Sequence, residues 1–261
     1  MSYRDIEKVN IRGVNFFSLD MDMAVIACEE MLNEGGFHSV HTPNSEIVEL
    51  CIEDNRYYDI INSADLIIPD GAGVILASKI LGKPLKYGKV AGVELCENLI
   101  KLAAEKGCRV FFLGGKEGIA QAAAEKMQEK YEGLQVCGVH NGYFSKCDSI
   151  EKAEFIKNGG KIDDDEKVIE EINNSRCDIL LVCLGVPAQE IWMNTYRNRL
   201  DCGLAGGFGG SFDIYSGASK RAPDIFIKLG LEWLYRLIKE PKRIGRMMKI
   251  PKFIFSTLFS K

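Results

Sequence analysis

Residues 109–131, RVFFLGGKEGIAQAAAEKMQEKY, form the clearest strand-to-helix unit of this 261-residue chain. The apolar run RVFFL predicts a buried strand, Gly114 and Gly115 end it, and Gly118 opens an Ala-rich helix. Such a turn lets main-chain N–H groups approach a phosphate at the helix N-terminus. Close packing of the strand against the helix would need the same glycines. Both interpretations stay open, because the spacing is not the dinucleotide fingerprint G-x-G-x-x-G.

Further strand-to-helix units lie on both sides of this one. The runs HSVHT, ADLIIPD and DILLVCLG are apolar or β-prone, and each precedes a predicted helix. This order predicts an α/β fold, with a Rossmann-like, mostly parallel sheet flanked by helices. Ligands of such sheets bind at the carboxyl ends of the strands, so we expect one shared cleft there. The polar or glycine residues that follow the strands are Thr42, Asn44, Asp70, Gly114, Gly115 and Gln189.

Several of these residues also have a purely structural interpretation. Asn44 can act as the N-cap of the helix SEIVELCIED. Asp70 can cap a helix or form a turn, or it can act as a carboxylate general base. Gln189 can donate and accept hydrogen bonds, as recognition of a sugar or uracil would require. Glu190 beside it reads as a surface charge favoured by the helix dipole.

A polar stretch, SKCDSIEKAEFIKNGGKIDDDE at 145–166, predicts a surface excursion followed by a helix over 166–175. It contains an Asp-x-Asp pattern at 163–165, which binds a divalent metal in many sugar-nucleotide enzymes. No strand precedes the pattern here, so a solvated charge run is the favoured interpretation and no metal site is predicted.

The nine cysteines contain no Cys-x-x-Cys pair and lie mostly in apolar runs. They therefore predict buried thiols in a reducing cytosol, not a disulfide framework or a zinc site. The N-terminal residues MSYRDIEKVNIRG lack the apolar segment of a signal peptide. No run of about 18 apolar residues suggests a membrane-spanning helix. A cytoplasmic protein is expected.

Charge is distributed unevenly along the chain. Residues 220–261 hold 11 Lys and Arg against 3 Asp and Glu, whereas residues 1–219 hold 22 against 34. We therefore expect a catalytic domain at 1–219 and a basic, amphipathic helical appendage at 220–261. Interleaved basic and apolar residues favour docking on an anionic membrane surface. A core-packing or subunit-interface stripe is the alternative, and a nucleic-acid partner lacks any recognition motif.

Transfer from a nucleoside-diphosphate sugar would need a general base and a counter-charge for the departing diphosphate. Asp70 is the best-placed base. No cluster of metal ligands is evident, so fixed cations would have to supply the positive charge. The candidates are Lys89, Arg236, Arg243 and Arg246.

The chain also resembles a known family, the WecG/TagA/CpsF glycosyltransferases, over about residues 9–250. The motifs that carry this resemblance are T-P-N at 42–44, PDG at 69–71, LGG at 113–115, NGYF at 141–144, G-x-P-x-QE at 185–190, GG-x-FD at 209–213, KRAP at 220–223, LEWLYRL at 231–237 and EPKR at 240–243. The chain differs from the usual pattern at Ala188, where Lys is common, and at Lys89, where Arg is common. These differences bear on the donor sugar more than on the reaction class.

The resemblance implies a cytoplasmic, membrane-associated, inverting hexosyltransferase that needs no cofactor or metal. It implies transfer of N-acetylmannosamine from a UDP-sugar to undecaprenyl-diphosphate-linked N-acetylglucosamine, in wall teichoic acid or related cell-surface polysaccharide synthesis. It places the base at Asp70, substrate contacts at Thr42, Asn44 and Gln189, and diphosphate binding at Arg236, Arg243 and Arg246.

Three alternatives remain open from the sequence. The same reaction could use another donor, such as N-acetylmannosamine uronate or a glucose-type UDP-sugar. A Rossmann-type NAD oxidoreductase is compatible with the fold, although the ribose-binding signature is missing. A membrane-surface scaffold would use the basic tail without catalysis. A homo-oligomer is compatible with all of these.

Overall fold

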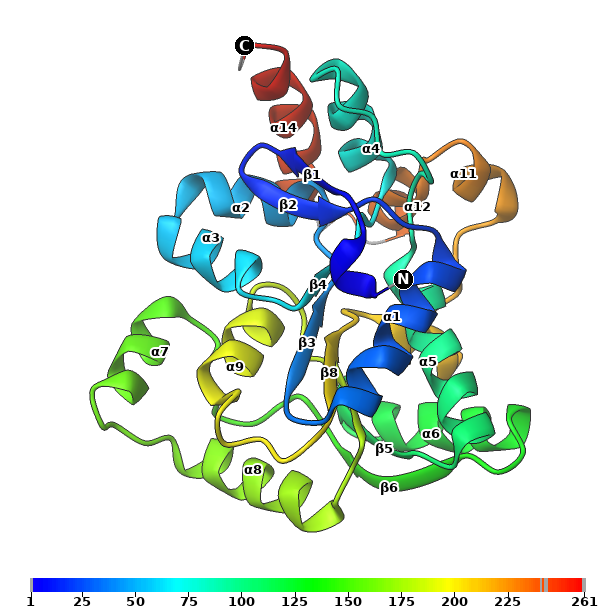
Figure 1. Ribbon diagram of the computed structural model, residues 1–261, viewed down its shortest axis with the longest axis vertical. Coiled ribbons are helices and arrows are strands. Elements are labelled where there is room, and N and C mark those ends of the chain that lie inside the picture. The colour runs from blue at the N-terminus through cyan, green and yellow to red at the C-terminus, as the bar shows by residue number, and fades with distance from the viewer. Residues whose placement is uncertain (1, 240, 242–243, 260–261) are drawn as a thin grey trace.

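Six parallel strands form the centre of the fold in the computed structural model, which describes residues 2–239, 241 and 244–259. Their order across the sheet is β4-β3-β8-β7-β5-β6 (Figure 1). The predicted α/β fold with a parallel sheet is therefore confirmed. The strands are β3 (His38–His41), β4 (Leu66–Ile67), β5 (Arg109–Gly114), β6 (Gln135–His140), β7 (Ile179–Cys183) and β8 (Leu204–Gly207).

Helices cover both faces of this sheet. Connections between parallel strands are right-handed. The direction in which the chain moves from one strand to the next therefore decides on which face of the sheet the connecting helix lies. Four helices pack together on the first face: α1 (Met21–Glu34), α5 (Gly92–Lys106), α6 (Ile119–Lys130) and α10 (Ser211–Tyr215). The other face carries α2 (Ser45–Glu53), α3 (Asn55–Asn62), α7 (Ile150–Lys157), α8 (Asp163–Ser175) and α9 (Ala188–Tyr196).

Burial of the central strands is nearly complete. All five residues of β7, ILLVC, are buried, and Phe111 and Phe112 of β5 have no exposed surface. Each large aliphatic or aromatic side chain contributes about 1.5–3 kcal/mol when it is fully buried. The sheet is therefore a rigid support for the loops that leave its carboxyl edge.

The N-terminal segment forms a hairpin apart from the main sheet. Following η1 (Tyr3–Asp5), β1 (Lys8–Ile11) and β2 (Val14–Phe17) pair antiparallel. The run VNIRGVNFFSL at 9–19 predicts a strand or hairpin, in agreement with this pairing. The hairpin packs against β4, α3 and α4 (Ala72–Ile80).

The structure departs from the prediction between residues 145 and 175. The expected surface excursion contains α7, and α8 starts at Asp163 instead of residue 166. Asp165 has no exposed surface, so the expectation that 163–165 is a solvated charge run is wrong at this residue. Its Oδ1 accepts from Trp192 Nε1 at 2.7 Å, and its Oδ2 accepts from Tyr196 Oη and the Cys147 N–H at 2.8 Å each.

The C-terminal residues form α11 (Asp224–Lys228), α12 (Glu232–Lys239), α13 (Ile244–Met247) and α14 (Lys249–Leu258). Helix α14 packs on α2 and α4, and the side chain of Phe253 is fully buried there. Pro251 could be expected to interrupt the C-terminal segment, but it lies in the first turn of α14. That position tolerates proline, since its N–H would have no helical partner.

Candidate functional site

The loop after β3 carries Thr42 and Asn44, two of the predicted substrate contacts. Thr42 is buried, and its Oγ1 donates to the carbonyl oxygen of Gly207 at 3.0 Å. Asn44 is the N-cap of α2, where its Oδ1 accepts from the N–H groups of Glu46 at 2.9 Å and Ile47 at 3.2 Å. The capping interpretation of Asn44 is therefore confirmed. Contact of either residue with a substrate stays a prediction.

Asp70, the predicted base, follows β4 and lies beside the loop after β3. Its N–H donates to the carbonyl oxygen of Pro43 at 3.3 Å, and the residue is partly exposed. The cap position of α4 belongs to Gly71, at φ 86°. A Cβ placed on Gly71 would lie 3.6 Å from Asn44 Cβ. Asn44 and Asp70 are therefore brought together at the carboxyl ends of β3 and β4.

Gly114 and Gly115 end β5 beside the neighbouring strand β7. Gly114 has φ 138°, and a Cβ there would lie 2.3 Å from the carbonyl oxygen of Cys183. The N–H of Gly115 donates to that same oxygen at 3.2 Å. These contacts support the packing interpretation of the glycine pair. Phosphate binding at this turn stays a prediction.

Gln189 and Glu190 open α9 at the carboxyl end of β7, and both are 1% exposed. Gln189 Oε1 accepts from the N–H of Gly209 at 3.0 Å, and its Nε2 donates to Glu190 Oε1 at 2.7 Å. Tyr57 Oη donates to Glu190 Oε2 at 3.2 Å. The interpretation of Glu190 as a surface charge is therefore wrong. Gln189 uses both ends of its amide within the protein.

Burial raises the pKa of Glu190 from its ordinary value of 4.5 to about 7. The neighbouring carboxylate of Glu46 adds to the rise, whereas the hydrogen bonds from Gln189 and Tyr57 oppose it. A carboxylic acid that titrates near neutral pH, next to the carboxyl edge of the sheet, is typical of functional sites.

The predicted cations lie on or near the C-terminal helices. Lys89 Nζ forms an ion pair with Glu232 Oε2 of α12 at 2.7 Å, and both side chains are mostly buried. Arg236 lies in α12 and Arg246 in α13, whereas Arg243 lies outside the described residues. The Lys89–Glu232 pair therefore ties α12 to the loop that precedes α5.

Helix α14 is held against α2 by ion pairs as well as by Phe253. Lys252 Nζ lies 2.8 Å from Glu49 Oε1 and 2.7 Å from Glu53 Oε1, and Lys249 Nζ lies 2.7 Å from Glu53 Oε2. Because α2 begins at Asn44, the appendage contacts an element that also carries a predicted site residue.

Two buried carboxylates, those of Asp165 and Glu190, were not identified from the sequence. A helical projection places Asp165 on the same face as the buried residues Val168, Ile169 and Ile172 of α8. Residues 188–193 are all buried, which is typical of a helix covered on every side. Only the first pattern was available in the sequence, because the burial of Gln189 and Glu190 depends on the segments that pack around α9.

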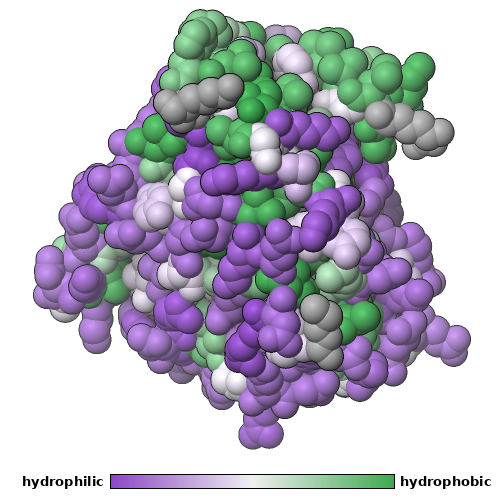
Figure 2. All heavy atoms as spheres, turned by 45° about the horizontal axis from the view of Figure 1, so that its top comes forward, coloured by the Kyte–Doolittle hydropathy of each residue, from purple (hydrophilic) through white to green (hydrophobic). Residues whose placement is uncertain are grey.

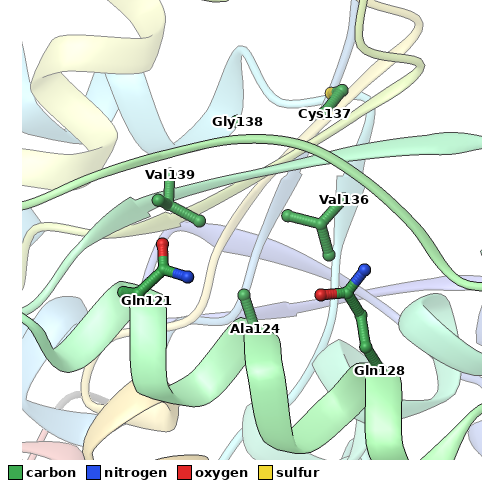
Figure 3. A pocket seen from close by; sticks show the side chains of 7 residues that line it. All are labelled: Gln121, Ala124, Gln128, Val136, Cys137, Gly138 and Val139. Atoms are coloured by element: carbon green, nitrogen blue, oxygen red, sulfur yellow. The ribbon is translucent and has the colours of Figure 1, made fainter.

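An open pocket lies between α6 and β6, the edge strand of the sheet (Figure 3). The side chains of Gln121 and Gln128 extend from α6 toward β6. The residues that line the pocket are Gln121, Ala124, Gln128, Val136, Cys137, Gly138 and Val139. None of these side chains is charged, so the pocket offers no cation to a diphosphate. It also includes none of the predicted site residues.

Within the described ranges, no three His, Cys, Asp or Glu side chains cluster as they would around a metal ion. All nine cysteines are free thiols, and seven of them are buried. No helix in the described part of the chain is long and apolar enough to span a membrane.

Comparison with known proteins agrees with the fold and the motifs. A chain of Bacillus spizizenii named N-acetylglucosaminyldiphosphoundecaprenol N-acetyl-beta-D-mannosaminyltransferase is 36% identical over 226 residues, which cover 87% of this chain and 80% of the relative. Proteins with the same name are 32% identical in Staphylococcus aureus strain MW2, covering 97% of this chain and 93% of the relative, and 33% identical in Bacillus subtilis, covering 84% and 78%.

A sequence model of the glycosyl transferase WecG/TagA/CpsF family matches residues 9–261. The match spans both the sheet and the C-terminal helices. It confirms the resemblance inferred from the motifs and the expectation of a glycosyltransferase. This chain belongs to the glycosyl transferase WecG/TagA/CpsF family.

Proposed function

We propose that this protein transfers N-acetylmannosamine, with inversion, from UDP-N-acetylmannosamine to undecaprenyl-diphosphate-linked N-acetylglucosamine. The observation that carries the proposal is the contact between the loops that hold Asn44 and Asp70, at one edge of the sheet in a member of this family. The printed names of the three relatives support the choice of sugar and acceptor. The product would serve wall teichoic acid or a related cell-surface polysaccharide.

In the proposed mechanism, Asp70 is the general base. Its carboxylate takes the proton of the acceptor hydroxyl while the hydroxyl oxygen attacks the anomeric carbon opposite UDP. The new glycosidic bond forms as the bond from the anomeric carbon to the diphosphate oxygen breaks. UDP leaves with that electron pair. Thr42, Asn44 and Gln189 are the proposed substrate contacts around this centre, and the turn at Gly114 and Gly115 approaches the phosphates.

Fixed positive charge would stabilise the departing diphosphate. Arg236, Arg243 and Arg246 are the proposed ligands, and Lys89 joins them by exchanging Glu232 for a phosphate oxygen. Arg suits this role because its planar guanidinium binds phosphate through two parallel hydrogen bonds. We expect the reaction to proceed without a metal or another cofactor.

We propose that the protein acts at the inner face of the cytoplasmic membrane, where the lipid-linked acceptor is held. Figure 2 shows apolar atoms gathered along the upper rim, the end where α4, α11 and α14 lie in Figure 1. Phe255 of α14 and Phe259, the C-cap of that helix, are 65% and 73% exposed, and the side chain of Lys252 on the same helix is 56% exposed. Exposed aromatic residues interleaved with lysine favour an anionic lipid surface.

The proposal is tested by acceptor-dependent UDP release from the purified protein, with a panel of UDP-sugars, lipid vesicles and EDTA present. Release with UDP-N-acetylmannosamine would support the donor, the reaction and metal independence together. Asp70→Asn should lower kcat by about 10²–10⁴-fold, the usual contribution of a general base. Asp201→Asn, at an exposed aspartate elsewhere, is the matched control.

Each outcome separates one part of the proposal from the rest. Release with another donor alone would replace the sugar but keep the mechanism. Turnover by Asp70→Asn close to that of the unmodified protein would refute the base assignment. Absence of release with every donor, despite vesicles and acceptor, would reject the transferase.

A further inference from the structure

The carboxylate of Glu190 joins two helices in the interior of the protein. It is 1% exposed, and each of its oxygens has a different donor. Tyr57 Oη of α3 donates to Oε2 at 3.2 Å, and Gln189 Nε2 of α9 donates to Oε1 at 2.7 Å. Neither donor comes from solvent. The ionised carboxylate is therefore held between α3 and α9.

This carboxylate also decides which way the Gln189 amide points. An ionised carboxylate can only accept hydrogen bonds, so it selects the orientation in which the NH₂ group of Gln189 faces it. The oxygen of Gln189 then faces the N–H of Gly209, from which it accepts at 3.0 Å. A flipped amide would direct NH₂ at that N–H, donor against donor.

Gly209 follows β8, the strand that lies between β3 and β7 in the sheet. The carbonyl oxygen of Gly207, two residues earlier, accepts from Thr42 of the loop after β3. A Cβ on Gly207 would lie 2.9 Å from Gln189 Nε2, so the close approach of the amide requires glycine there. The end of β8 is therefore held from one side by Thr42 and from the other by Gln189.

We propose that Glu190 is a positioning residue of the transferase site, which acts through Gln189 to fix the main chain at 207–210. The residue does not touch the reacting atoms. It keeps Gln189 in one orientation, and thereby fixes the loop that separates the ends of β3 and β7. The kinetic part of this inference rests on the proposed function, whereas the structural part does not.

Protonation of Glu190 would weaken the arrangement, because one carboxyl oxygen would then carry a proton and the two acceptors would no longer be equivalent. The groups that face this carboxyl are Tyr57 of α3, Glu46 and Cys51 of α2, and Gln189 of its own helix. Burial and the Glu46 carboxylate raise the pKa of Glu190 to about 7. The main chain at 207–210 should therefore become less firmly held as the pH falls through neutrality.

The experiment compares the unmodified protein with Glu190→Gln in two measurements. The first is the pH profile of kcat/KM, and the second is amide hydrogen exchange of peptides covering residues 204–215. Gln at 190 stays neutral and can present either its oxygen or its NH₂ group to Gln189, so the orientation is no longer selected. Glu170→Gln, at an exposed acid of α8, is the control.

We expect the unmodified protein to lose kcat/KM on the acid side with an apparent pKa of about 7. Glu190→Gln should lack this acid limb. In mildly alkaline solution its kcat/KM should be lowered by about 3–10-fold, through kcat more than through KM. Its main-chain amides at 207–210 should exchange hydrogen faster than those of the unmodified protein. An unchanged acid limb in Glu190→Gln, or unchanged exchange at 207–210, would overturn the inference. If the unmodified protein releases no UDP, the proposed function fails by itself, and the exchange measurement still decides the role of Glu190.

Discussion

Helix α9 is held at its two ends by buried carboxylates that differ in their hydrogen bonds. At its C-terminal half, Asp165 of α8 accepts from Trp192, Tyr196 and the Cys147 N–H. At its start, Glu190 accepts from Gln189 and one tyrosine. Burial raises the pKa of both acids, that of Glu190 to about 7.

The difference in pKa shows how burial and neighbouring charge set the state of a buried acid. Desolvation is the largest cause of the rise for both acids, and each is opposed by three hydrogen bonds, since a main-chain hydrogen bond at Glu190 joins those from Gln189 and Tyr57. Glu190 faces the carboxylate of Glu46, which disfavours its ionised form, whereas Asp165 faces Lys146, which favours it. Asp165 binds side chains of α9 and the main chain before α7, whereas Glu190 lies at the carboxyl end of β7. We infer that Asp165 fixes the fold, whereas Glu190 serves the site.

The largest effect on stability is expected for Asp165→Ala. The substitution leaves the Trp192 Nε1–H, the Tyr196 hydroxyl and the Cys147 N–H without their acceptor in the interior. Each unsatisfied buried donor costs about 1–3 kcal/mol, so the free energy of unfolding should fall by about 3–5 kcal/mol. Chemical denaturation monitored by tryptophan fluorescence measures this loss.

Two further variants sharpen that prediction. Asp165→Asn keeps one oxygen, which can still accept from Tyr196 and Cys147, so its loss should be smaller than that of Asp165→Ala. Asp163→Ala removes an exposed carboxylate of the same helix, and should change stability by about 1 kcal/mol or less. Equal losses for Asp163→Ala and Asp165→Ala would show that the buried hydrogen bonds do not carry the effect.

Much of the fold could be predicted because local and global signals agree. The five apolar residues of β7 predict a buried strand. The periodicity of residues 21–34 predicts a helix that Gly35 ends, and this helix coincides with α1, which Asp20 caps. Helix α3 carries a helical signal as well, since Tyr57, Ile60 and Ile61 of its sequence NRYYDIIN recur at i, i+3 and i+4 and are all buried. Its buried face, with Tyr57 and Ile61, is defined by neighbours distant in sequence.

The site was only partly predictable for a similar reason. Apolar strands followed by polar residues indicate the carboxyl edge, and the edge does collect Thr42, Asn44 and Asp70. The partners of those residues depend on how distant segments pack. That Thr42 binds Gly207, or that Tyr57 reaches Glu190, is not encoded in any local pattern. The supporting contacts therefore became visible only in the folded chain.

The second prediction concerns Glu190→Gln and the pH dependence of stability. The pKa of Glu190 is higher in the folded chain, about 7, than its ordinary value of 4.5. The folded state thus binds the proton more tightly, and this residue lowers the free energy of unfolding as pH rises between those values. The decrease amounts to about 3 kcal/mol, and Glu190→Gln should remove it.

This prediction is measured as a difference between two curves. Unfolding free energies of the unmodified protein and of Glu190→Gln are determined across the acid-to-neutral range. The difference isolates Glu190 from acids such as Glu34 and Glu53, whose lowered pKa values act in the opposite direction. Parallel curves for the two proteins would contradict the elevated pKa of Glu190.

The smallest effect is expected for Glu53→Gln, where the carboxylate is 40% exposed instead of buried. Its ion pairs with Lys249 and Lys252, both at 2.7 Å, connect α2 to α14, but solvent screens them. Stability should fall by about 0.2–1 kcal/mol, and less in high salt. The same denaturation measurement checks this, with the exposed Glu170→Gln as control. A loss as large as that of Asp165→Ala, or one that persists in high salt, would mean that docking of α14 depends on these ion pairs more than on the buried ring of Phe253.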